Sequence, residues 1–203
     1  MNAKQSRFFV VLALAITVQI SALRAGIVIN MVESGSDVVA TFSGSINSLD
    51  GATLFQTGNA GMANGFRPAP APMAFLIAST PGTIPVFYYN IAAFPTSFGT
   101  SDSFFSATSS TVTANMIFRD FLVIDQAYVL GTPVTGTSTW ANQTFSSLSL
   151  TEGSYLWSWT GDSVTLNIGA APSPVPEPGT WAAAALLVGA AGCVRWRKRA
   201  KVS

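Results

Sequence analysis

The chain of 203 residues contains no histidine, and its single cysteine is Cys193. Without histidine, the catalytic pairs that join histidine to serine or cysteine are excluded, and so is histidine-ligated zinc. One cysteine forms no disulfide within the chain. Charged residues make up only 9% of the sequence. We therefore expect a protein with no cofactor, no metal and no enzymatic activity.

The few charges are unevenly distributed. Between Gly26 and Pro176 there are two basic residues, Arg67 and Arg119, against eight acidic ones, which gives this part a formal charge of −6. The other basic residues lie near the two ends of the chain. An acidic body lacks the cationic surface that nucleic acid phosphates require, so nucleic acid is not an expected partner.

Residues 1–25 have the pattern of a secretory signal peptide. Lys4 and Arg7 precede an apolar core from Phe8 to Ile20, and small residues before and at Ala25 suit a cleavage site. The core is about 13 residues long, which is short of the roughly 20 that span a bilayer, so cleavage after Ala25 is favoured over a retained anchor. The expected partners are Sec-type export machinery and signal peptidase.

A second apolar run lies within residues 180–203, after a proline-rich linker at 171–179. The stretch from Trp181 to Val194 is uncharged, and Trp181 and Trp196 bracket it at positions suited to membrane interfaces. We predict a short transmembrane helix. Under the positive-inside rule the basic cluster after this helix stays cytoplasmic. The acidic body is then on the opposite, non-cytoplasmic side of the inner membrane. The cluster comprises Arg195, Arg197, Lys198 and Arg199.

Pro176, Glu177 and Pro178 precede this run. Proline on both sides enforces an extended backbone without amide donors, which displays the Glu177 carboxylate on a stiff strand. The order of this tripeptide, an Ala/Leu/Gly-rich run and an arginine-rich end resembles the PEP-CTERM sorting signal of exported Gram-negative bacterial proteins, here at 174–199. The alternative interpretation is a semi-rigid spacer that holds the body off the membrane.

The resemblance implies that exosortase, an integral-membrane cysteine-protease-like enzyme, recognises and removes the signal. Such proteins often occur in organisms that make extracellular polysaccharide. The chain would then be exported, held briefly by a single-pass anchor with a cytoplasmic C-terminus, and delivered to the cell envelope or the extracellular space. Residues 131–169 are also similar to the C-terminal part of the ectodomain in many PEP-CTERM proteins, a similarity that implies no established activity.

The body, residues 26–170, has alternating apolar and polar residues that predict an all-β, antiparallel and jelly-roll-like β-sandwich without helices. The segments GIVINMV and VVATFSGSI predict an opening hairpin around 33–37, and YLWSWT and SVTLNI predict a closing one with a type II′ turn at Gly161-Asp162. Residues 67–72 predict a polyproline-like surface loop, while 106–113 fit a strand or a loop. Further strands are expected from Met73, Val86, Phe121, Ala127 and Thr144.

The function expected first is that of a structural protein of the envelope or matrix, associated with exopolysaccharide or biofilm. The alternative is a carbohydrate-binding module, in which exposed aromatic rings stack on sugars. Trp157 and Trp159 have the spacing of core residues. Tyr88 and Tyr89 point to opposite faces of a strand, so at least one is expected to be exposed. Trp140 and Tyr88 are therefore the candidate glycan-stacking residues.

A third alternative is a glycosidase with Asp120 and Asp125 as the paired carboxylates. Solvated loop acids are the favoured interpretation of these residues. The same holds for four aspartates near turns, because the sequence lacks an Asp-x-Asp-x-Asp-Gly calcium loop. These four are Asp37, Asp50, Asp102 and Asp162. Residues 142–144 match a glycosylation sequon, a tripeptide that recurs by chance.

Overall fold

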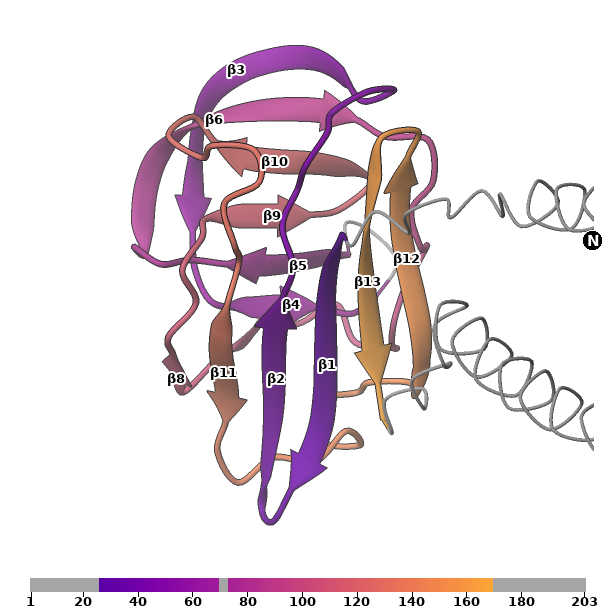
Figure 1. Cartoon of the computed structure of the whole chain (residues 1–203). Coiled ribbons are helices and arrows are strands. Elements are labelled where there is room, and N and C mark those ends of the chain that lie inside the picture. The colour runs from indigo at the N-terminus through magenta and orange to yellow at the C-terminus, as the bar shows by residue number, and fades with distance from the viewer. Residues whose placement is uncertain (1–25, 70–72, 170–203) are drawn as a thin grey trace, which may run out of the picture. The chain divides into compact units, whose positions relative to one another are not determined.

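Two β-sheets account for the regular structure of the chain in the computed structural model, which describes residues 26–69 and 73–169 (Figure 1). These residues all fall within one compact unit, Arg24–Pro172. The all-β prediction is confirmed: within the described ranges there are strands and no helices. The predicted signal peptide, linker, transmembrane helix and basic tail lie outside them. Among the residues that the structure describes, no helix is long and apolar enough to cross a membrane.

The six-stranded sheet has the order β12-β13-β1-β2-β11-β8. The opening hairpin is confirmed, with Val38, Ala40 and Phe42 buried on one face as the alternation predicts. Strand β1 pairs with β13 in parallel, whereas the other strand pairs of this sheet are antiparallel. The first and last strands therefore lie side by side. The strands are β1 (Ile27–Ser34), β2 (Asp37–Ser43), β8 (Ser109–Ser110), β11 (Gly136–Trp140), β12 (Gly153–Trp159) and β13 (Asp162–Ile168).

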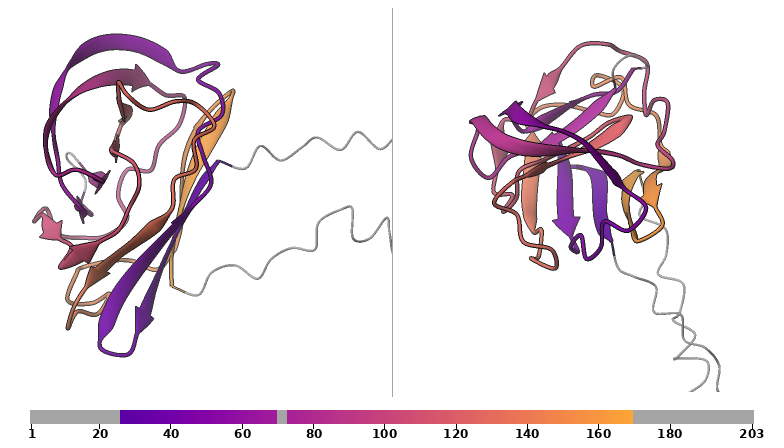
Figure 2. Two further views of the ribbon diagram at one scale, coloured as in Figure 1. Left: turned by 60° about the vertical axis from the view of Figure 1, so that its left-hand side comes forward. Right: turned by 90° about the horizontal axis from the view of Figure 1, so that it is seen from above.

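The seven-stranded sheet has the order β3-β6-β10-β9-β5-β4-β7 and is antiparallel throughout. Its strands cross those of the first sheet rather than run alongside them, and β3 and β6 curve strongly (Figure 2). The jelly-roll assignment stays a prediction. The strands are β3 (Thr53–Met62), β4 (Gly65–Arg67), β5 (Ala74–Ile77), β6 (Gly82–Asn90), β7 (Phe105–Ser106), β9 (Met116–Phe118) and β10 (Phe121–Asp125).

Aromatic side chains fill the space between the sheets. Phe42 of the first sheet meets Phe75 of the second at 6.1 Å between ring centroids. Trp157 and Trp159 are buried, as their spacing predicts, and their indole N–H groups donate to backbone carbonyls of Arg119 and Ser48. Each large ring thus removes apolar area from water while its polar atom keeps a partner.

The closing hairpin forms one residue earlier than predicted. Trp159 pairs with Asp162, so the turn residues are Thr160 and Gly161, and neither has a positive φ as a type II′ turn would require. The reason is that Asp162 is buried in β13, where its carboxylate accepts hydrogen bonds from the backbone N–H groups of Asn47 and Ser163. Gly161 is needed for a different reason, because a Cβ there would press against Ser48 and Asp50.

Three other predictions from the sequence were wrong. The segment after Ala127 is a turn and loop, in which Val129 is 69% exposed. The segment from Thr144 is a series of turns closed by Leu148 N–H and Leu150 N–H donating to Thr144 and Phe145. The loop predicted at 67–72 is not a surface loop where it is described, since Pro68 and Ala69 are buried. Residues 106–113, for which the sequence left strand or loop open, contain the end of one two-residue strand, a second two-residue strand and loops.

Candidate functional site

The outer face of the seven-stranded sheet, which points away from the other sheet, carries a second apolar cluster. Register pairing places four of its side chains in one row across four strands: Tyr88 beside Val123, Val123 beside Ile117, and Ile117 beside Leu76. Ile117 and Val123, in the middle of this row, are buried at 8% and 1% exposure. The outer face of the sheet therefore has a small apolar core of its own.

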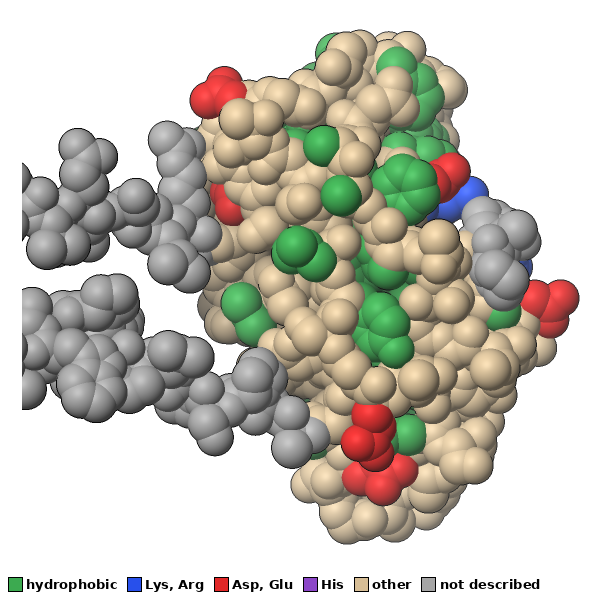
Figure 3. Space-filling model, turned by 90° about the vertical axis from the view of Figure 1, so that its right-hand side faces the viewer, with side chains coloured by type: hydrophobic (Ala, Val, Ile, Leu, Met, Phe, Trp, Pro, Cys, Tyr) green, Lys and Arg blue, Asp and Glu red, His purple; other side chains and the backbone are tan. Residues whose placement is uncertain are grey.

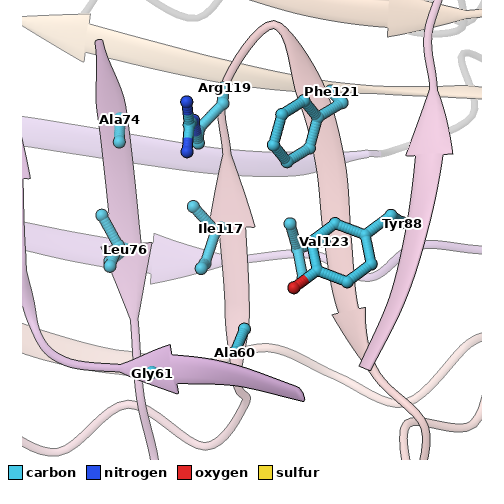
Figure 4. A pocket seen from close by; sticks show the side chains of 9 residues that line it. All are labelled: Ala60, Gly61, Ala74, Leu76, Tyr88, Ile117, Arg119, Phe121 and Val123. Carbon is cyan, nitrogen blue, oxygen red and sulfur yellow. The ribbon is translucent and has the colours of Figure 1, made fainter. Parts of the chain in front are cut away.

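These side chains form the floor of a hollow of about 330 Å³ (Figure 4). Ala60 and Gly61, from the far end of the curved strand β3, line one side of it. Phe121 and Arg119 line the opposite end, as the close view shows. The volume is at the lower end of the range typical for small-molecule sites. The curvature of β3 thus converts a flat sheet face into a concave one.

Three aromatic rings gather beside the hollow. Phe55, Tyr88 and Phe121 have ring centroids 5.9 to 6.1 Å apart in each pairing. Phe55 occupies the position where the β3–β6 register shifts, so the bulge directs its ring toward this face, and it is 47% exposed. The Tyr88 hydroxyl donates to the Asn59 carbonyl at 3.1 Å. Tyr88 and Tyr89 point to opposite faces as expected, but both are half-buried, Tyr88 against this second cluster and Tyr89 against the main core.

Arg119 supplies the positive charge of the hollow. Its guanidinium carbon lies 4.8 Å from the centre of the Phe121 ring, a cation–π distance. Its Nε is 3.7 Å from Oδ1 of Asp120, which is too long for a hydrogen bond, and the Asp120 side chain is 57% exposed, so solvent weakens this ion pair. The cation is consequently oriented by the ring more than by the carboxylate.

The structure corrects the candidate role of Trp140. Its side chain is 2% exposed, its ring lies 5.0 Å from that of Phe66, and its indole N–H donates to the Phe105 carbonyl. A sugar has no access to a ring held between two sheets. Tyr155 is also excluded from an open platform, because it packs against the core and its hydroxyl donates to Thr151; burial raises the pKa of that phenol.

The structure keeps the proposed glycosidase carboxylates apart. Asp120 immediately precedes β10 and Asp125 ends it, so their Cα atoms are about 16 Å apart along the extended strand and their side chains point to opposite faces of the sheet. Paired glycosidase carboxylates lie roughly 5–9.5 Å apart. Asp125 instead accepts hydrogen bonds from the Asn115 amide and the Ala127 N–H, which closes a turn.

The four aspartates considered for calcium do not form a cluster. In residues 26–69 and 73–169, no three acidic, histidine or cysteine side chains lie close enough to hold a metal ion together. Asp162 has the structural role described above, and Asp37 accepts a hydrogen bond from the Asn142 N–H. Asn142 itself has a positive φ of 54° at a turn.

The surface on the side of β12 is dominated by uncharged polar groups and backbone, with separate acidic and apolar side chains among them (Figure 3). Sequence reasoning missed this hollow because β3 was not predicted as a strand, and because Phe55 reaches the face through a bulge. The sequence did predict a strand from Phe121. The short turn at Arg119-Asp120, which could have been recognised, places Arg119 and Phe121 on the same face.

The predicted sorting residues Pro176, Glu177 and Pro178 and the basic cluster lie outside the described residues, so their recognition rests on the sequence. No curated protein and no solved structure matches the chain. One family model does match, that of the PEP-CTERM protein-sorting motif, at residues 174–199. This is the range that the resemblance had indicated, and the chain therefore carries a PEP-CTERM sorting signal at its C-terminal end.

Proposed function

We propose that the chain is an exported, non-enzymatic protein of the cell envelope or extracellular matrix, processed by exosortase and associated with exopolysaccharide or biofilm. The observation that carries the proposal is the sorting motif at 174–199, which implies export and exosortase processing. Its setting supports the proposal: the motif follows an acidic β-sandwich and precedes a basic end. Exosortase would read the Glu177 carboxylate, and the basic cluster would stay cytoplasmic until cleavage.

Fractionation of the native host tests this proposal. In cells with active exosortase, the protein should appear in the envelope or extracellular polymer. In cells whose exosortase is inactivated, it should accumulate in the inner membrane. A distribution that is the same in both strains would contradict exosortase processing. A matrix defect on deletion of the protein would support the structural role, and an unchanged matrix would count against it.

The second candidate function is a carbohydrate-binding module delivered by the same route. The observation that favours it is the ring cluster of Phe55, Tyr88 and Phe121, in which Phe55 is exposed and the other two rings are half-buried. Glycan-array binding that falls on Tyr88→Ala, but not on Trp140→Phe, would support this role. No observation favours the glycosidase alternative, since Asp120 precedes β10 and Asp125 ends it.

A further inference from the structure

Both cations of the described residues lie on the outer face of the seven-stranded sheet. Arg67 pairs with Ala74 across β4 and β5, and Phe75 pairs with Phe118 across β5 and β9. Arg119 follows Phe118 and therefore lies next to Ala74 in the same row. An acidic domain has thus placed its two positive side chains on either side of one alanine, beside an apolar hollow.

The two guanidinium groups retain hydrogen-bonding capacity. The Nε atoms of Arg67 and Arg119 are buried and have no hydrogen-bond partner within residues 26–69 and 73–169. Buried donors are usually paired, and a guanidinium has five N–H groups arranged to match a carboxylate. Asp120 lies only within ion-pair distance of Arg119 and is itself largely exposed. The chain therefore supplies Arg119 with a weak anion, which a ligand's carboxylate is able to displace.

The floor of the hollow indicates the body of that ligand. Leu76, Ile117 and Val123 offer no polar atom, and the Tyr88 hydroxyl already donates to Asn59. A sugar buried there would leave hydroxyl groups without partners, which is costly. A saturated or aromatic hydrocarbon body needs no hydrogen bond from this floor, where Leu76 is half-buried and Ile117 and Val123 are buried.

We propose that this hollow binds a small amphipathic carboxylate, with its apolar body over Leu76, Ile117 and Val123 and its carboxylate on Arg119. The charge complementarity and the apolar floor together select this ligand class over a neutral hydrocarbon, which would leave the Arg119 Nε without a hydrogen-bond acceptor. They also select it over a sugar acid, whose body is polar. The inference does not depend on the sorting pathway.

The test is a titration of the full chain, held in phosphatidylcholine nanodiscs, with cyclohexanecarboxylate. Binding is detected by saturation-transfer NMR. Cyclohexanecarboxamide keeps the body without the charge, and glucuronate keeps the charge on a polar body. Both should bind at least about tenfold more weakly than cyclohexanecarboxylate. The amide loses the charge-assisted hydrogen bonds to Arg119, and glucuronate buries hydroxyl groups without partners. Arg119→Gln should weaken cyclohexanecarboxylate binding by about tenfold.

Asp120→Asn provides a variant with the opposite expected effect. Removing the neighbouring carboxylate should tighten binding of cyclohexanecarboxylate by about twofold, because the ligand no longer competes with it. Asp102→Asn removes the same charge at an exposed site elsewhere and should leave the affinity unchanged. Saturable binding with this pattern would support the proposal. Equal binding of the amide, tighter binding of glucuronate, insensitivity to Arg119→Gln, or no saturable binding would overturn it.

Discussion

The carboxylate Oε1 of Glu33 accepts a hydrogen bond of 2.6 Å from the backbone N–H of Phe145, 112 residues later in the chain. Phe145 is 8% exposed, and the turns that follow it bring Leu148 into the core at 1% exposure. One acidic side chain on the opening hairpin thus fixes the start of a segment that has no strand to hold it.

Replacing Glu33 by alanine should therefore destabilise the fold. The Phe145 N–H would lose its charged acceptor, at a cost of about 1 kcal/mol in the free energy of unfolding, because the contact is only partly buried. Glu33→Gln keeps an oxygen acceptor and should cost less. Urea unfolding followed by tryptophan fluorescence measures both, and equal losses for the two variants would show that the hydrogen bond is not responsible.

Trp140→Ala should act on stability. The buried ring packs on Phe66, and its removal leaves a cavity and breaks the hydrogen bond to the Phe105 carbonyl, so we expect a loss of about 3–5 kcal/mol in the free energy of unfolding. Trp140→Phe keeps an aromatic ring and should lose less. Thermal unfolding monitored by circular dichroism tests this. A stable Trp140→Ala protein that has lost glycan binding would restore the stacking hypothesis.

Gly44→Ala should be strongly destabilising. Gly44 has a φ of +109°, which residues with a Cβ rarely adopt, and a Cβ there would overlap the carbonyl of Gly26 in the neighbouring chain segment. We expect a loss of at least about 2 kcal/mol. Gly61→Ala is the matched control, because that glycine has an ordinary φ and open space at the Cβ position. Similar melting temperatures for the two variants would contradict this prediction.

Tyr128 should make stability depend on alkaline pH. Burial raises the pKa of its phenol above 10.0, and the charge of Asp162 acts in the same direction, opposed by the hydrogen bond from the Ile46 N–H. The folded state therefore holds the proton more tightly than the unfolded state. Its contribution to stability is complete below pH 10 and is lost as the pH rises through the raised folded value.

The free energy of unfolding should accordingly fall as the pH rises above about 10, through the raised folded pKa of Tyr128. The fall should be smaller in Tyr128→Phe, which lacks the titrating group. Tyr89 and Tyr155, whose pKa values are also raised by burial, keep part of the dependence in that variant. The same pH dependence in wild type and Tyr128→Phe would assign the effect to other groups.

The sequence predicted the fold where a strand has one face in the core. Val38, Ala40 and Phe42 alternate with less buried residues, and both terminal hairpins follow this rule. It failed where tertiary contacts replace periodicity. The segment from Thr144 alternates like a strand, yet Glu33 and local turns hold it in another conformation.

The opposite failure occurred at β3. TLFQTGNAGM shows no apolar alternation, because this edge strand is exposed on most of its length. Its pairing with β6 depends on residues 20 to 37 positions away, and the pairs that flank the bulge at Phe55 are 32 and 35 positions apart. The candidate site therefore could not be assembled from sequence, although Tyr88 could be singled out. The sorting motif could be recognised from the sequence because it is a local pattern of residue types that needs no tertiary partner.

Intact-mass measurement of the mature protein from its native host tests the central claim most directly, with wild type compared to Glu177→Ala. Sorting at the PEP-CTERM motif predicts a wild-type mass that lacks residues 1–25 and the basic C-terminal segment, with processing near Pro176 to Pro178. In Glu177→Ala the C-terminal segment should be retained. A wild-type protein that still ends at Ser203 would contradict the account.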